Sequence, residues 1–118
     1  MLSRWDYESV MAETHPIDAL YAVIQSRKGA NPETSYTAKL FAQGTLKIAK
    51  KLGEEGVETA LAAVAEDETA LIAESADLLY HLLVLWAARD LSPADVYRAL
   101  EGRTQRSGLA EKAARDPS

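Results

Sequence analysis

Residues 47–81 read KIAKKLGEEGVETALAAVAEDETALIAESADLLYH, and this stretch decides the fold. Two runs of apolar residues at helical spacing are separated by the polar break 65–69, in which Asp67 is suited to cap the second run. A link this short joins antiparallel neighbours. The sequence therefore predicts two helices, about 45–65 and 67–89, that lie side by side.

Acidic residues occupy matching positions in these two predicted helices. Glu55 and Glu58 are three residues apart, as are Glu74 and Asp77, so each pair shares a helix face. Counted from position 66, Glu58 and Glu74 each lie eight residues away, and Glu55 and Asp77 each lie eleven away. At ~1.5 Å rise per residue, the pairs sit at similar heights, roughly 12 and 16 Å from the turn. We therefore expect four carboxylates to converge.

The rest of the chain is also predicted to be helical, because no alternating strand pattern competes. We expect a helix over 16–28, a short helix over 36–43, and another that starts at Ser92-Pro93-Ala94-Asp95, with Ser92 as the cap and Pro93 in the first turn. The boundaries of the first two are marked by Pro16, Gly29, a cap at Ser35 or Thr34, and Gly44. The prediction is a single all-α domain over 1–118, a four- to five-helix bundle-like fold. Residues 1–15 are an N-terminal extension and 103–118 a C-terminal tail, both of uncertain order.

The predicted helix 67–89 is apolar nearly all round, which is typical of a helix buried on several sides. In a domain of 118 residues that burial calls for a second subunit, so we expect a homodimer whose helices complete each other's core. In the preceding helix, Gly53 and Gly56 each cost ~1 kcal/mol relative to alanine. We expect a neighbouring backbone to approach closely there.

Composition excludes several classes of function. The chain has no cysteine, so thiolate metal sites and cysteine nucleophiles are ruled out, and the net charge of −5 argues against nucleic-acid binding. The N-terminus lacks the apolar core of a signal peptide, and the apolar run 71–88 is interrupted by Glu74, Asp77 and His81. We therefore expect a cytoplasmic protein and no membrane span.

Carboxylate oxygens suit Mg²⁺ or Mn²⁺, and Mg²⁺ commonly bridges to substrate phosphates. No glycine-rich phosphate loop is present, so lysines such as Lys47, Lys50 and Lys51 would assist. The alternative is a solvated helix face, with Lys50–Glu54 and Lys51–Glu55 as surface pairs worth ~0.3–0.5 kcal/mol each. Acids within the apolar helix 67–89 weigh against it, because their burial needs an offsetting charge.

The pattern Glu-Glu-x-x-Glu at 54–58, followed by Glu-x-x-Asp at 74–77, resembles the metal-binding signature of the all-α NTP pyrophosphohydrolases. Three further segments are similar to the phosphoribosyl-ATP pyrophosphohydrolase family: SYT at 35–37, KKLGEE at 50–55 and ADLLYHLLVL at 76–85. The resemblance covers roughly 17–100. It implies a hydrolase of histidine biosynthesis that converts phosphoribosyl-ATP, by metal-activated water, to phosphoribosyl-AMP and pyrophosphate.

The resemblance also implies residue roles. Metal (Mg²⁺, with Mn²⁺ possible) would be held by Glu55, Glu58, Glu74 and Asp77. The catalytic carboxylates would be Glu54, Glu55 and Glu58, with Glu54 as a ligand or as the base. We expect the nucleotide substrate to contact Tyr36, Lys39, Lys47, Lys50, Lys51 and His81. A house-cleaning NTP or dNTP pyrophosphohydrolase and a non-catalytic metal-binding helical dimer remain open as alternatives.

For the other histidine and the aromatic residues the sequence favours plainer roles. A lone histidine such as His81 is also often a hydrogen-bonded structural residue, and His15 is expected to be a loop residue. Tyr80 and Trp86 are expected in the core or at a subunit interface.

Overall fold

A computed structural model describes residues 15–104 of the chain. Over this range there are five α-helices and no strand: α2 Pro16–Ser26, α3 Tyr36–Gln43, α4 Thr45–Ala65, α5 Glu68–Ala88 and α6 Pro93–Thr104. The prediction of an all-α fold is confirmed. The expected extension and tail lie outside the described residues, apart from His15 and the last two residues of α6.

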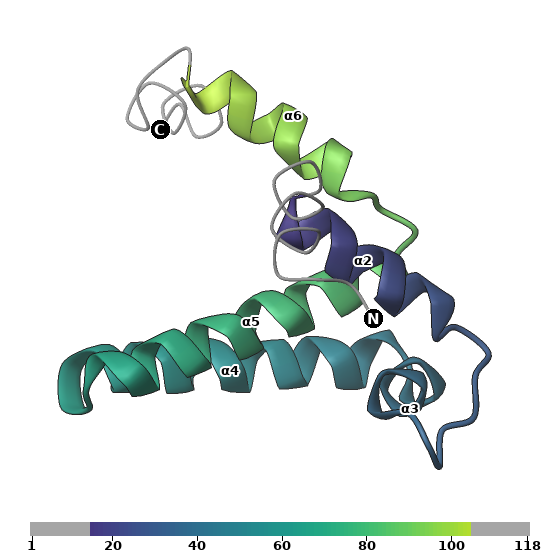
Figure 1. Cartoon of the computed structure of the whole chain (residues 1–118), viewed down its shortest axis with the longest axis horizontal. Helices are drawn as coiled ribbons and strands as arrows, with labels where there is room; N and C mark the ends of the chain where they lie inside the picture. Colours follow the sequence, from purple (N-terminus) through teal and green to yellow (C-terminus); the bar gives the residue numbers. More distant parts are fainter. Residues whose placement is uncertain (1–14, 105–118) are drawn as a thin grey trace, which may run out of the picture.

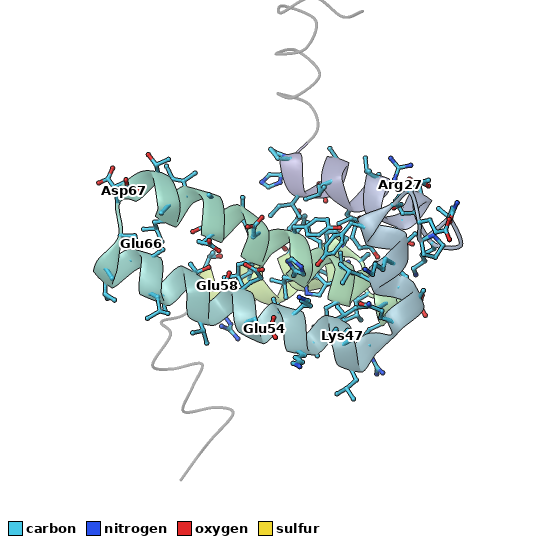
Figure 2. All side chains as sticks on the ribbon, turned by 90° about the horizontal axis from the view of Figure 1, so that it is seen from below. Arg27, Lys47, Glu54, Glu58, Glu66 and Asp67 are labelled. Carbon is cyan, nitrogen blue, oxygen red and sulfur yellow. The ribbon has the colours of Figure 1, made fainter. Side chains whose placement is uncertain are left out.

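The two long helices form the predicted antiparallel hairpin, and α4 and α5 lie side by side in Figure 1. Glu66 and Asp67 link them at one end, which Figure 2 shows from below. The Asp67 carboxylate accepts a hydrogen bond from the Ala70 amide at 2.9 Å, so Asp67 is the N-cap of α5, as its sequence position indicates.

The other end of the hairpin carries the core. Helix α2 packs against the C-terminal half of α5, and α3 lies at the start of α4 (Figure 1). The large side chains that are fully buried there come from four helices and are all at most 1% exposed: Ile24, Leu40, Ile48, Leu83 and Val84. We call this end of the hairpin the packed end, and the end at the Glu66–Asp67 link the open end.

Gly44 separates α3 from α4, as predicted. Its φ of 91° is a left-handed conformation that side-chain-bearing residues rarely adopt, which explains glycine at this break. Its amide bonds the carbonyls of Leu40 and Phe41, both at 3.2 Å, and ends the short helix. At the start of that helix the Ser35 hydroxyl accepts from the Ala38 amide at 3.1 Å, so Ser35 is the cap.

Helix α6 leaves the body and contacts α2 (Figure 1). The Tyr97 hydroxyl donates to Asp18 at 3.1 Å. Asp95 accepts from the Ser92 amide at 2.9 Å, and this bond is the main reason that the pKa of Asp95 is lowered. The predicted start of this helix is confirmed. His15 precedes the helix as expected, but it is more than a loop residue, because its Nδ1 accepts from the Ile17 amide at 3.1 Å and caps α2.

The close backbone approach expected at the two glycines of α4 is also wrong. A Cβ at Gly53 would meet nothing within 4 Å among the described residues. At Gly56 the nearest neighbour is a side-chain atom, Cδ1 of Leu78, at 4.0 Å. A leucine side chain, and not a neighbouring backbone, therefore faces Gly56, and Gly53 faces open space among the described residues.

The open end exposes apolar surface. Four side chains of the hairpin that lie away from α2 and α3 are more than half exposed: Val57 at 60%, Leu61 at 56%, Val64 at 82% and Ile72 at 70%. Helix α5 is therefore not buried on all sides within the single chain. By length and composition it meets the criteria for a membrane span, but core helices of soluble proteins meet them as well, and α5 packs along α4.

Candidate active site

Three carboxylates converge at the middle of the hairpin. Glu55 and Glu58 of α4 and Glu74 of α5 each offer an oxygen, and these oxygens all lie within 4.8 Å of one another. Helical spacing brings Glu55 and Glu58 onto one face, and the antiparallel partner delivers Glu74 at the same height. We call these three residues the carboxylate cluster. The expected convergence is thus found for three of the four acids.

Asp77, the fourth acid, lies at the edge of this cluster. It is exposed and is not among the acids whose oxygens meet within 4.8 Å. Its charge still contributes to raising the pKa values of Glu55 and Glu74, so it lies nearby. Counting residues from the turn predicts axial height but not the rotation of each side chain about its helix, which accounts for the difference.

The cluster holds more negative charge than its surroundings neutralise. Burial, followed by the neighbouring charge of Glu58, raises the pKa values of both Glu55 and Glu74. One oxygen of each, Glu55 Oε2 and Glu74 Oε2, is buried with no hydrogen-bond partner among residues 15–104. Buried carboxylate oxygens normally have a partner. Hard anionic oxygens left unpartnered at this distance fit a divalent cation such as Mg²⁺ or Mn²⁺.

His81 lies beside the cluster and is only 5% exposed. Its Nδ1 donates to the Asp77 carbonyl at 2.8 Å, since a carbonyl can only accept. Its Nε2 is buried without a partner in the described part of the chain. The ring also acts on Glu55 electrostatically, against the rise in that residue's pKa. His81 therefore has a structural bond through one nitrogen and a free position at the other.

Two tyrosines connect His81 to the surface. The Tyr36 ring lies 6.2 Å from the His81 ring and stacks on Tyr80 at 6.4 Å. The Tyr80 hydroxyl is hydrogen-bonded to the Thr37 hydroxyl, and burial raises the pKa of Tyr80. Tyr36 is 52% exposed, so this aromatic group reaches from the buried histidine to solvent.

Two hollows flank this arrangement. The larger, ≈ 630 Å³, lies beside α3 and is lined by Pro32, Glu33, Thr34, Ser35, Tyr36 and Lys39. The smaller, ≈ 350 Å³, is lined by Glu58, Leu61, Ala65, Glu66 and Glu74 and borders the cluster directly. We assign the chemistry to the edge of the smaller hollow, because the acids are there. The larger one connects to them through Tyr36 and His81.

Glu54 and the lysines lie outside the cluster. Lys51 Nζ is 3.7 Å from Glu54, whose side chain is 47% exposed. The ion pair in the structure is therefore Lys51–Glu54, and not Lys50–Glu54 or Lys51–Glu55, the pairs considered under the alternative of a solvated helix face. Lys50 lies one helical turn before Glu54 and is exposed, and Lys47 is half-buried. Figure 2 shows Lys47, Glu54 and Glu58 in succession along α4 toward the link.

Thr59 is a residue of this site that was not expected from the sequence. Its hydroxyl is 2.8 Å from the Glu55 carbonyl and 3.1 Å from the Glu74 carbonyl, so it connects the two acid-bearing helices. The sequence could have indicated this role, because Thr59 is a polar residue that follows Glu58 directly, on the side of α4 that faces α5. Tyr80, expected in the core or at a subunit interface, packs against the core as a partly buried side chain and is also hydrogen-bonded to Thr37.

Comparison with known proteins identifies the family. The family model described as phosphoribosyl-ATP pyrophosphohydrolase matches residues 17–104. A phosphoribosyl-ATP pyrophosphatase of Azospirillum brasilense is 62% identical over 99 residues, which are 84% of this chain and 89% of the relative. That of Parvibaculum lavamentivorans is 58% identical over 104 residues, 88% of this chain and 95% of the relative. The predicted resemblance and the prediction of an enzyme are confirmed, and the chain belongs to the phosphoribosyl-ATP pyrophosphohydrolase family.

Proposed function

We propose that the chain hydrolyses the α–β phosphoanhydride of phosphoribosyl-ATP to give phosphoribosyl-AMP and pyrophosphate, a step of histidine biosynthesis. Its family membership supports the substrate. The observation that carries the chemistry is the carboxylate cluster with two buried, unpartnered oxygens.

The cofactor we propose is Mg²⁺, with Mn²⁺ as a substitute. Glu55, Glu58 and Glu74 would hold it, and Asp77 at the edge of the cluster would add a ligand. When bound, such a cation neutralises charge on the phosphate oxygens and makes the bound water more acidic. The excess of buried negative charge described above supports this assignment.

The protein's own contribution is to accept a proton and to orient the phosphates. The oxygen of a water forms a bond to the α-phosphorus, the α–β bridging bond breaks, and pyrophosphate leaves with the bond electrons. A carboxylate takes the proton of the water, and the raised pKa of Glu55 suits it to that task. Glu58 lies on the same face of α4 as Glu55 and is a proposed ligand of the cation. Glu54 is exposed and paired with Lys51, so we place it outside the proton transfer and near the departing phosphates.

Substrate contacts are proposed around the larger hollow and along α4. Tyr36 and Lys39 line that hollow, His81 offers its free Nε2, and Lys47, Lys50 and Lys51 supply positive charge. We expect Tyr36→Phe or Lys39→Ala to raise KM without changing the fold. Lys28→Ala is the control, because Lys28 pairs with Asp90 and is not among the residues that line the hollow. Unaltered kinetics in both variants would remove this segment from the site.

We further propose that the protein is a cytoplasmic homodimer. The exposed apolar side chains at the open end support the dimer, because a second copy would cover them. The cytoplasmic location is supported by the proposed substrate, because this small nucleotide is made inside the cell.

The decisive assay is pyrophosphate release from phosphoribosyl-ATP compared with ordinary nucleoside triphosphates. We expect turnover of phosphoribosyl-ATP to exceed that of ATP and dATP by orders of magnitude. Preferential release from ordinary or modified triphosphates would indicate a house-cleaning enzyme instead. No release from any of them in the presence of Mg²⁺ or Mn²⁺ would indicate a non-catalytic helical protein.

A further inference from the structure

The hydroxyl of Thr59 is shared by the two helices that carry the carboxylate cluster. It lies 2.8 Å from the carbonyl of Glu55, four residues earlier in its own helix, and 3.1 Å from the carbonyl of Glu74 in α5. The first contact is the ordinary back-bond of a helical threonine. The second is unusual, because the Glu74 carbonyl belongs to the other helix. Both acceptors are the backbone of residues whose side chains form the cluster.

This contact joins the two helices at the level of the carboxylate cluster, between the packed end and the exposed apolar side chains of the open end. On the α4 side, a Cβ placed at the neighbouring residue Gly56 would meet only a leucine methyl, Cδ1 of Leu78, at 4.0 Å. Beyond Thr59, toward the link, Ala62 is fully buried, whereas Leu61 and Val64 are exposed. Near the cluster, the bond of the Thr59 hydroxyl therefore adds a directional restraint on the axial position of α4 along α5 to the apolar contacts of Ala62 and Leu78.

We propose that Thr59 is a positioning residue for the carboxylate cluster: its hydroxyl fixes the axial register of α4 against α5 so that Glu55 and Glu74 can serve one cation. This rests on the proposed metal site. Oxygens that share a small divalent ion lie about 3 Å apart, from metal–oxygen distances of ~2.1 Å at right angles. In the structure the cluster's oxygens lie within 4.8 Å of one another, so they must approach further to share one ion, and the axial register of the two helices limits that approach.

The test compares a hydroxyl removal with its conservative rescue. Thr59→Val replaces the hydroxyl by a methyl group and so keeps the shape of the side chain. Thr59→Ala removes both the hydroxyl and the γ-methyl, and Thr59→Ser keeps the hydroxyl and removes only the γ-methyl. Thr69→Val is the matched control, since Thr69 is an exposed threonine of α5. Mn²⁺ binding to each protein without substrate is measured by calorimetry, and helix content without metal is measured by circular dichroism.

We expect Thr59→Val and Thr59→Ala to bind Mn²⁺ about tenfold more weakly, as for other residues that orient metal ligands, with the helix content of the wild type. Thr59→Ser and Thr69→Val should bind like the wild type. Wild-type affinity in Thr59→Val or Thr59→Ala, or a loss of helix content in both, would show that the bond is merely structural and overturn the proposal. If the wild type itself binds no Mn²⁺, both this proposal and the proposed metal site are wrong.

Discussion

The packed and open ends of the α4–α5 hairpin differ in what covers their apolar side chains. At the packed end Ile48 and Leu83 are at most 1% exposed, because α2 and α3 lie over them. At the open end Leu61 is 56% exposed and Val64 82% exposed, and no other described helix lies over them (Figure 1). One chain thus builds a core at one end only, and the carboxylate cluster lies between that core and the uncovered surface.

This difference separates stability from function along one pair of helices. The packed end supplies the free energy that holds the hairpin together, since buried side chains account for most of the hydrophobic stabilisation. The middle holds acids whose mutual repulsion opposes folding until a cation binds. Substitutions at the packed end, in the cluster and at the open end should therefore affect different measurements.

The largest effect is expected in the cluster. Glu55→Gln removes a proposed ligand and the proposed proton acceptor, so turnover of phosphoribosyl-ATP should fall by at least about 10²–10³-fold. Glu101→Gln, in the exposed part of α6, is the control and should leave turnover unchanged. The rate of pyrophosphate release at saturating substrate is the measurement. Wild-type turnover in Glu55→Gln would remove this residue from the chemistry.

The second-largest effect is expected on the free energy of unfolding, when a leucine is replaced by alanine at each of the two ends. Leu83→Ala at the packed end should cost ~2–5 kcal/mol of unfolding free energy, because it leaves a cavity in the core. Leu61→Ala at the open end should cost within about 1 kcal/mol in the dissociated protein. Urea unfolding at low protein concentration measures both. Equal costs would mean that the two ends are packed alike.

A third prediction concerns what covers the open end. Val64→Lys and Ile72→Lys introduce charge on the exposed apolar surface, so they should dissociate the proposed dimer while each subunit keeps its helix content. Sedimentation analysis gives the mass. Charged replacements of Leu82 or Leu85 are less informative, because both side chains are half-buried within the single chain and a charge there also disturbs the packing of one subunit. A wild type that sediments as a fully active monomer would refute the dimer.

Most helix boundaries were predictable because local chemistry sets them. Ser35, Gly44, Asp67 and Pro93 mark helix ends at the positions that capping rules indicate. The role of His15 was missed, since an imidazole is an uncommon N-cap and the sequence does not show which nitrogen is free. Local signals also predicted helix 16–28 two residues too long, because α2 ends at Ser26.

The candidate site was predictable in its axial arrangement but not in its detail. Symmetry about the link brought Glu55, Glu58 and Glu74 together, whereas the outward direction of Asp77 depends on rotation about the helix axis. The bond of Thr59 across the hairpin depends on the distance between the helices, which no spacing rule provides. The same distance decides what the glycines face, and for that reason the expected backbone approach was wrong.

The smallest effect is a dependence of stability on pH without metal. The pKa values of Glu55 and Glu74 are raised above 4.5 in the folded state, so the folded protein binds protons more readily than the unfolded chain. Their contribution to stability is fully present below pH 4.5 and is lost as pH rises through the raised pKa values.

The melting temperature of the metal-free protein should therefore increase modestly as the pH is lowered from 7 toward 5. In Glu58→Gln, which removes the second-largest cause of both shifts, the increase should be smaller. Asp95, whose lowered pKa acts in the opposite direction, titrates below 3.8 and does not interfere in this range. An equal pH dependence in Glu58→Gln and wild type would show that the cluster is not its source.

The melting temperature with and without divalent cation tests the central claim that the cluster binds metal. A ligand at about 100 times its dissociation constant stabilises by about 2.7 kcal/mol, so millimolar Mg²⁺ or Mn²⁺ should raise the melting temperature of the wild type. Glu58→Gln should melt at an equal or higher temperature without metal, because repulsion is relieved, and should respond little to either cation. A wild-type melting temperature that is unchanged by millimolar Mg²⁺ and Mn²⁺ would contradict the account.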